Sequence, residues 1–111
     1  MSDSEAPPTP PEDASAASSA ATVITRQVVI CNRRGLHARA AAKFVTLAER
    51  FGASVDVIKD GQDVSARSIM GLMMLGAGMG STVELRAEGW DAKEAMDALA
   101  ALVEAGFDER D

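Results

Sequence analysis

The stretch NRRGLHARAAA, residues 32–42, decides the fold, because it joins a predicted strand to a predicted helix and carries the chain's one histidine. Before it, residues 23–31 are mostly β-branched and apolar, which is typical of a strand. After it, apolar residues recur at helical spacing as far as Phe51, and Gly52 is a natural residue just beyond a helix end. We therefore expect His37 at or next to a helix N-terminus.

This predicted position of His37 suits an anionic ligand. The free backbone N–H groups and the positive end of the helix dipole attract anions. The same field disfavours imidazolium, so we expect a neutral, nucleophilic ring near pH 7 that can accept a phosphoryl group. Arg39 adds a forked guanidinium that can pair with phosphate oxygens, and Gly35 lets the backbone approach the site closely.

Two other interpretations of His37 stay open on these residues alone. A lone histidine beside an apolar helix is more often a packed or capping residue than a catalytic one. A thiol–imidazole pair of Cys31 and His37 is also conceivable, although a small hydrophobe at a strand end is the simpler interpretation of Cys31. One cysteine and one histidine cannot build the usual zinc site, and a lone cysteine fits a reducing cytoplasm.

The charge balance disfavours nucleic acid and anionic membranes as main partners. The 111 residues carry a formal net charge of -6, of which residues 1–22 contribute four acidic side chains and no basic ones. The rest of the chain is close to neutral and can still present a local basic patch. No apolar run is long enough to cross a membrane, and the acidic N-terminus lacks the apolar stretch of a secretory signal.

The chain divides into two parts at about Thr22. Residues 1–22 are rich in Ala, Ser and Pro and have nothing to pack a core, so they are predicted to be a disordered tail. A regulatory or tethering role, or an upstream start codon chosen in error, are the alternatives for this tail. Residues 23–111 are predicted to form one domain with a small core.

The pattern downstream of the first helix predicts the remaining elements. Residues 54–58 and 62–66 form a hairpin across Asp60-Gly61, and residues 68–76 read as two helical turns between Ser68 and Gly76. The glycine-rich residues 76–80 lack the spacing of a nucleotide-binding loop and are a connection. Residues 81–87 alternate as a fourth strand, and Asp91 with Glu94 resembles a capping box opening a last helix. This β-α-β-β-α-β-α order favours an α+β fold with the helices on one face of the sheet.

Two separated motifs resemble those of one known family. Gly-Leu-His-Ala-Arg, residues 35–39, is similar to the active-site signature of HPr, the histidine-containing phosphocarrier of the bacterial sugar phosphotransferase system, and of its nitrogen-related sibling NPr. Ser-Ile-Met-Gly, residues 68–71, resembles the segment that opens the short second helix of these proteins. The resemblance covers about residues 23–107. It implies the HPr fold, an open-faced four-stranded antiparallel sheet backed by three helices.

The resemblance also implies a function and a site. His37 would accept a phosphoryl group on Nδ1 from phosphorylated enzyme I and pass it to a histidine of an EIIA-type protein. Arg39 would steady the phosphoryl group, and Ser68 would be a regulatory phosphorylation site for HPr kinase/phosphorylase, unless it is simply a helix N-cap. The carrier would be a cytoplasmic monomer without metal or bound cofactor, and a stoichiometric relay rather than a turnover enzyme.

Docking to several partners is expected to use an exposed apolar patch beside His37. Its residues are Leu36, Ile69, Met70 and Met73, with Lys43 on the basic rim formed together with Arg50 and Arg33 or Arg34. Leu72 and Leu75 are instead expected in the core.

Two departures from the family pattern concern the start of the helix and its outer face. Ala40 stands where many HPr proteins have proline, so a slightly looser helix start is expected, and Glu49 stands where lysine is frequent. These differences leave open which branch is served, so an NPr-like regulatory module that signals by phosphorylation state is the alternative function. A structural or nucleic-acid-binding domain with an incidental histidine is a further alternative, which the acidic balance and the scarcity of aromatic residues disfavour.

Overall fold

Four strands form one antiparallel sheet in the computed structural model, which describes residues 23–109. They are β2 (Val23–Val29), β3 (Ser54–Lys59), β4 (Gln62–Ser65) and β5 (Thr82–Glu88), and they lie in the order β2-β5-β3-β4. The last strand in sequence, β5, therefore lies between β2 and β3, with Val28 opposite Val83 and Val57 opposite Leu85. This register puts the alternating apolar residues of neighbouring strands on one face.

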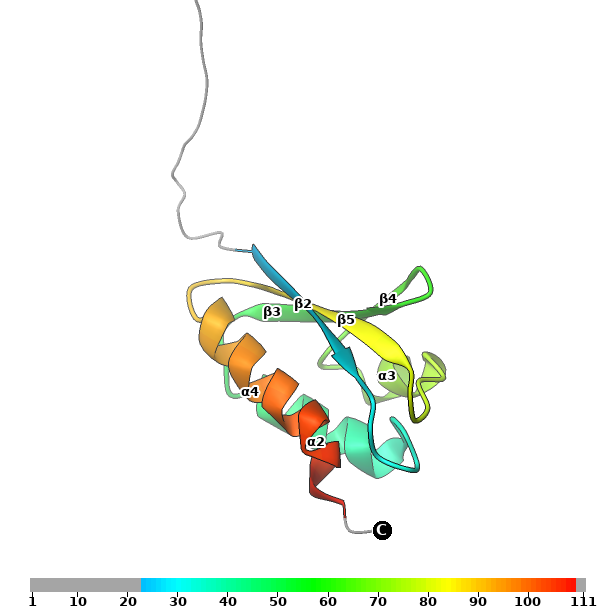
Figure 1. Cartoon of the computed structure of the whole chain (residues 1–111). Coiled ribbons are helices and arrows are strands. Elements are labelled where there is room, and N and C mark those ends of the chain that lie inside the picture. Colours follow the sequence, from blue (N-terminus) through cyan, green and yellow to red (C-terminus); the bar gives the residue numbers. More distant parts are fainter. Residues whose placement is uncertain (1–22, 110–111) are drawn as a thin grey trace, which may run out of the picture.

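Three α-helices cover that face of the sheet (Figure 1). They are α2 (Ala38–Ala48), α3 (Ile69–Met74) and α4 (Ala92–Glu104), and a short turn of helix, η1 (Gly106–Asp108), follows α4. The α+β fold expected from the sequence is confirmed, with the elements in the order that the pattern predicted. None of the helices within residues 23–109 has the length and apolarity needed to span a membrane.

The core lies between the sheet and the helices. β5 alternates buried and partly exposed residues, and its buried Leu85 packs in one cluster with Phe44 of α2 and Leu99 of α4. Phe107 of η1 is fully buried in the same cluster. The chain beyond α4 is therefore held to the core by a large aromatic side chain, and this anchoring matters for the site described below.

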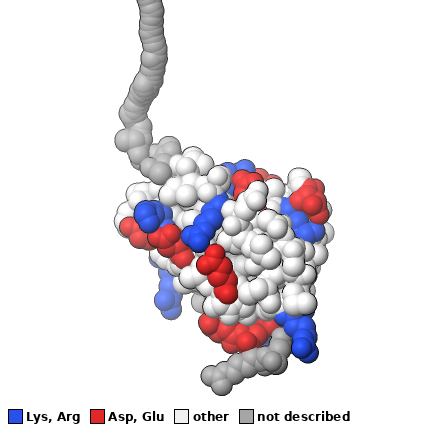
Figure 2. Space-filling model, in the orientation of Figure 1, with Lys and Arg blue, Asp and Glu red and all other residues white. Residues whose placement is uncertain are grey.

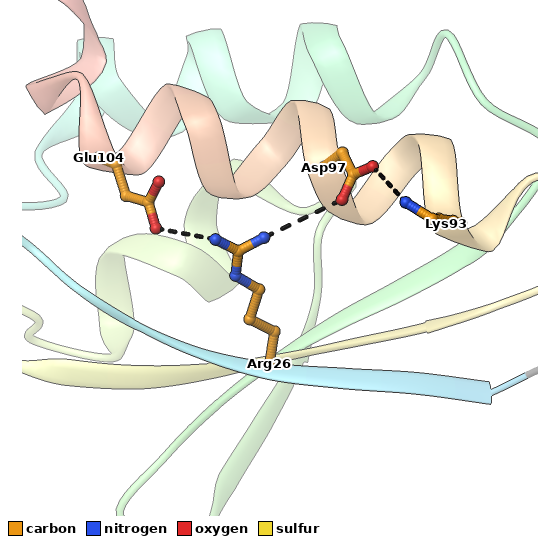
Figure 3. A network of polar contacts seen from close by, with 4 residues as sticks. All are labelled: Arg26, Lys93, Asp97 and Glu104. Carbon is orange, nitrogen blue, oxygen red and sulfur yellow. Dashed lines mark hydrogen bonds and ion pairs between the residues drawn. The ribbon is translucent and has the colours of Figure 1, made fainter.

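A polar network ties the edge strand β2 to α4. Arg26 donates to Glu104 at 3.2 Å and lies 4.0 Å from Asp97, which also pairs with Lys93 (Figure 3). A charged side chain on the covered side of an edge strand disfavours pairing with further strands. Figure 2 shows acidic and basic side chains interspersed over one face of the molecule, with white surface between them.

The element bounds differ from the sequence prediction mainly at the helix ends. The helix that carries the predicted apolar stripe stops at Ala48 rather than Phe51, and the last helix stops at Glu104. The capping box predicted at Asp91 is wrong, because the Asp91 side chain makes no cap hydrogen bond. Its two oxygens instead accept from the backbone N–H groups of Gly52 and Ala53, at 2.9 and 2.8 Å. The tail predicted for residues 1–22 lies outside the described residues.

Candidate functional site

His37 is the N-cap residue of α2, as the sequence predicted within one residue. Its backbone is extended, with φ -81° and ψ -179°, and its carbonyl accepts from the N–H of Ala41 at 2.8 Å. The free backbone N–H groups of the first turn of α2 therefore lie at the same end of the helix as the imidazole. The imidazole does not cap them, so they are available to an anion held at this end of α2.

The loop before His37 is shaped by Gly35. This glycine has φ +68°, and a Cβ there would stand 2.5 Å from the carbonyl oxygen of Ala77 and 2.7 Å from Cα of Gly78. The close approach allows the N–H of Leu36 to donate to Ala77 at 2.8 Å. Gly35 thus holds the loop of His37 against the connection that follows α3, which agrees with the close backbone approach expected of it.

The Nε2 atom of His37 is paired with the carboxylate of Glu109, from the end of the described chain. The other carboxylate oxygen accepts from Nδ2 of Asn32 at 2.9 Å, and the same amide donates to the carbonyl of Gly35 at 2.8 Å. The hydrogen bonds from His37 and then Asn32 lower the pKa of Glu109 below its ordinary value. Glu109 therefore joins Asn32 and His37, which lie 77 and 72 residues before it, in one polar cluster, here called the Asn32–Glu109–His37 cluster.

Sequence reasoning did not identify Asn32 or Glu109 as site residues. Asn32 lies inside the stretch that carries the histidine, and the structure buries its amide, but its burial could not be read from the sequence. Glu109 lies 72 residues from His37 in sequence, and no local pattern in the sequence predicts their contact.

Arg39 lies at the first turn of α2 and its side chain is exposed. Within residues 23–109 it makes no hydrogen bond or ion pair of its own. It lines a groove of about 470 Å³ between α2 and α4, together with Lys43 and Arg50. Lys43 also donates to the carbonyl of Phe107 at 2.7 Å, so this lysine links α2 to the segment that carries Glu109. The groove presents three cationic side chains spread along α2, from Arg39 in its first turn to Arg50 beyond its C-terminal end, and Asp108 of η1 also lines it.

The expected apolar patch is exposed in part. Ile69, Met70 and Met73 of α3 are exposed, with Met70 at 69%. Leu36, by contrast, is only 8% exposed and packs in the core, so its expected place in the exposed patch is wrong. The reason is that Leu36 precedes the N-cap and turns inward beneath α2. Met74, the last residue of α3, is a further exposed apolar residue, at 72%.

Ser68 and Cys31 are both engaged in local hydrogen bonds. The Ser68 hydroxyl is the N-cap of α3 and accepts from the N–H of Gly71 at 2.9 Å, as its capping interpretation predicted. The Cys31 thiol donates to the carbonyls of Val103 and Glu104, at 3.4 and 3.5 Å. The alternative of a Cys31–His37 pair is therefore wrong, because the thiol bonds these two carbonyls and the imidazole bonds Glu109.

A helix N-terminus with a histidine at its N-cap, beside an arginine that has no partner among residues 23–109, is an arrangement that can bind a phosphoryl group. Comparison with known proteins identifies the family. Residues 24–105 match the family model described as "PTS HPr component phosphorylation site". The chain is 50% identical over 88 residues to phosphocarrier protein NPr of Shewanella violacea, covering 79% of this chain and 97% of that relative.

A second relative and a solved structure give the same assignment. Phosphocarrier protein HPr of Cupriavidus necator is 51% identical over 87 residues, covering 78% of this chain and 98% of the relative. The crystal structure of HPr-C-His from Thermoanaerobacter tengcongensis superposes with a TM-score of 0.75 at 46% identity, covering 78% of this chain and 98% of that one. The chain belongs to the HPr family, and its role is that of a phosphocarrier of the phosphotransferase system.

Proposed function

We propose that Nδ1 of His37 is the atom that carries the phosphoryl group. The observation that carries this proposal is the engagement of Nε2 by Glu109 at the N-terminus of α2. A carboxylate only accepts hydrogen bonds, so Nε2 holds the hydrogen and the neutral ring has its lone pair on Nδ1. Within residues 23–109 no group hydrogen-bonds Nδ1, which leaves that nitrogen open to an incoming phosphorus atom.

Arg39 is proposed to steady the transferred group. Its guanidinium is exposed and unpaired within the described residues, two positions after the histidine, and can offer two parallel N–H groups to phosphoryl oxygens. Charge stabilisation and in-line positioning are the main requirements of phosphoryl transfer. A phosphocarrier must also release the phosphoryl group. A single arginine and the N–H groups at a helix end can stabilise the group during transfer without holding it too tightly for release.

The proposed donor is phosphorylated enzyme I, charged originally from phosphoenolpyruvate, and the proposed acceptors are EIIA-type proteins. Docking would use the exposed Ile69, Met70 and Met73 of α3, together with Lys43 of the cationic groove between α2 and α4. Methionine side chains adapt to different partner surfaces, and cations suit an acidic partner. The protein would act as a cytoplasmic monomer that carries one phosphoryl group at a time, without metal or cofactor.

Ser68 is proposed as a second, regulatory phosphorylation site for an HPr kinase/phosphorylase. A phosphate on the N-cap of α3 is electrostatically favourable for the helix. It would add negative charge beside the exposed methionines and weaken docking to an acidic partner. An NPr-like regulatory module stays the alternative output, because the NPr and HPr relatives match the chain almost equally well, at 50% and 51% identity.

The test follows labelled phosphoryl groups from phosphoenolpyruvate through enzyme I to this chain and on to an EIIA-type acceptor. Wild-type protein is expected to pass label onward, and His37→Ala is expected to neither accept nor pass it while keeping a native circular dichroism spectrum. Arg39→Ala is expected to accept label more slowly. Label on the His37→Ala variant would assign the carrier to another residue and refute the proposal.

A further inference from the structure

We propose that Glu109, held by Asn32, is a positioning residue that keeps the hydrogen on Nε2 of His37 and thereby makes the phosphoryl transfer reversible. This inference rests on the proposed function of His37 and concerns Nε2, the ring nitrogen that does not bind the phosphoryl group. The Asn32–Glu109–His37 cluster is shielded, because the side chains of His37 and Glu109 are only 15% and 12% exposed. A hydrogen bond in such a place resists competition from water.

The backbone brings Glu109 to the ring by an unusual path. Gly106, Phe107 and Asp108 have φ of 64°, 57° and 59°, so three successive residues adopt the left-handed conformation. This conformation is unfavourable for residues other than glycine. Burial of the Phe107 side chain and the hydrogen bond from Lys43 to its carbonyl hold the turn in place. Strained turns that surrounding contacts hold in this way are concentrated at functional sites.

Asn32 fixes the carboxylate in turn. Both of its donated hydrogen bonds come from Nδ2, to Gly35 and to Glu109, while its buried Oδ1 has no hydrogen-bond partner among the described residues. Rotating the amide by half a turn would set Oδ1 against two other oxygens, the Gly35 carbonyl and the Glu109 carboxylate. The attractive orientation is therefore the one with Nδ2 toward them. Asn32 thus orients Glu109, and Glu109 orients the imidazole.

The hydrogen on Nε2 determines the charge of the imidazole before and after phosphoryl transfer. In acceptance, the Nδ1 lone pair forms a bond to phosphorus as the bond between phosphorus and the donor atom of enzyme I breaks and its electron pair returns to that atom. The ring of His37 becomes positively charged, and the carboxylate of Glu109 stabilises that charge through the Nε2 hydrogen. In donation, the Nδ1–phosphorus bond breaks and its pair returns to Nδ1. Because Nε2 kept its hydrogen, the leaving group is neutral imidazole and not an imidazolate anion.

The test uses Glu109→Ala, which removes the acceptor, and Glu109→Gln, which keeps an acceptor but removes the charge. Glu104→Ala is the matched control, because it removes a carboxylate from the end of α4 that pairs with Arg26 and not with His37. Imidazole nitrogen NMR of the unphosphorylated proteins reports the tautomer. Stopped-flow transfer from phosphorylated enzyme I, measured over a range of enzyme I concentrations, separates docking from chemistry.

Wild type and Glu104→Ala are expected to show the Nε2–H tautomer, and Glu109→Ala a mixture of both tautomers. The maximal transfer rate is expected to fall about tenfold in both Glu109 variants with the half-saturating enzyme I concentration unchanged, a smaller loss than removal of the aspartate causes in a buried catalytic triad. A wild-type tautomer in Glu109→Ala, or wild-type rates in both Glu109 variants, would overturn the inference. If wild-type protein accepts no phosphoryl group, the proposed function fails, and the nitrogen spectra still decide what Glu109 does to the ring.

Discussion

Replacing Gly35 by alanine tests how tightly the loop of His37 is built. Two costs arise at this position. The left-handed φ of +68° costs an L-residue about 1 kcal/mol. The new Cβ would also stand 2.5 Å from the Ala77 oxygen and 2.7 Å from Gly78 Cα, both backbone atoms, so the connection must move. That movement weakens the 2.8 Å hydrogen bond from Leu36 to Ala77, which is worth about 1 kcal/mol.

Gly76 supplies a matched control for the first cost. It has φ +65°, close to that of Gly35, but a Cβ there would meet nothing within 4 Å. Gly78 controls for the substitution itself, because it lacks a left-handed φ and its Cβ would also enter open space. Alanine also restricts the unfolded chain, which offsets about 0.5 kcal/mol in each variant. The contact cost of Gly35 is therefore the difference between Gly35→Ala and Gly76→Ala.

The expected loss in the free energy of unfolding is about 3 kcal/mol for Gly35→Ala, once about 1.5 kcal/mol of overpacking against the connection is added to the two costs and the offset is subtracted. The expected loss is about 0.5 kcal/mol for Gly76→Ala, and Gly78→Ala is expected to gain about 0.5 kcal/mol. Urea unfolding followed by circular dichroism measures all three, with a common slope against denaturant as the check on two-state behaviour. Equal losses for Gly35→Ala and Gly76→Ala would show that the loop is not held against the connection, and would refute the reasoning.

Three further predictions concern buried acceptors, pH and docking. Asp91→Ala should lower the free energy of unfolding by about 2 kcal/mol in urea unfolding, because the N–H groups of Gly52 and Ala53 lose a charged acceptor; a loss under about 0.5 kcal/mol would contradict this. The hydrogen bonds from His37 and Asn32 lower the pKa of Glu109 in the folded protein below its ordinary 4.5. The ionised carboxylate therefore stabilises the fold above pH 4.5, and this contribution is lost as the pH falls through the lower pKa of the folded state. Unfolding midpoints should therefore drop less steeply below pH 5 in Glu109→Gln than in wild type, and parallel curves would argue against the contact. Ser68→Asp should slow transfer from enzyme I while leaving the circular dichroism spectrum unchanged, and an unaltered rate would remove the docking argument.

Local patterns in the sequence predicted the parts of the fold that local physics determines. The alternation along β5 predicted a strand with one buried face, and the structure buries Val83, Leu85 and Ala87. Asp60-Gly61 predicted a hairpin turn, and both residues have positive φ, at 51° and 83°. The N-cap roles of His37 and Ser68 likewise follow from residues within one helical turn.

Long-range packing decided what the sequence could not predict. Asp91 had the local surroundings of a helix cap, but its carboxylate binds N–H groups that lie 38 and 39 residues away in sequence. Leu36 lies next to the reactive histidine, yet it turns into the core because the loop folds beneath α2. Glu109 reaches His37 only because Phe107 is buried and the chain reverses after α4. Each of these outcomes depends on contacts between elements, and no periodicity within one element encodes them.

Phosphorylation of His37 can be read from the intact mass of the protein after incubation with enzyme I, phosphoenolpyruvate and Mg²⁺, measured before and after brief acid treatment. The account predicts the added mass of one phosphoryl group on the wild type, its complete removal by acid, and no added mass on His37→Ala. Acid removal identifies a phosphohistidine, and His37 is the one histidine of the chain. An unmodified wild type, or added mass that survives acid, would contradict the assignment of His37 as the phosphoryl carrier.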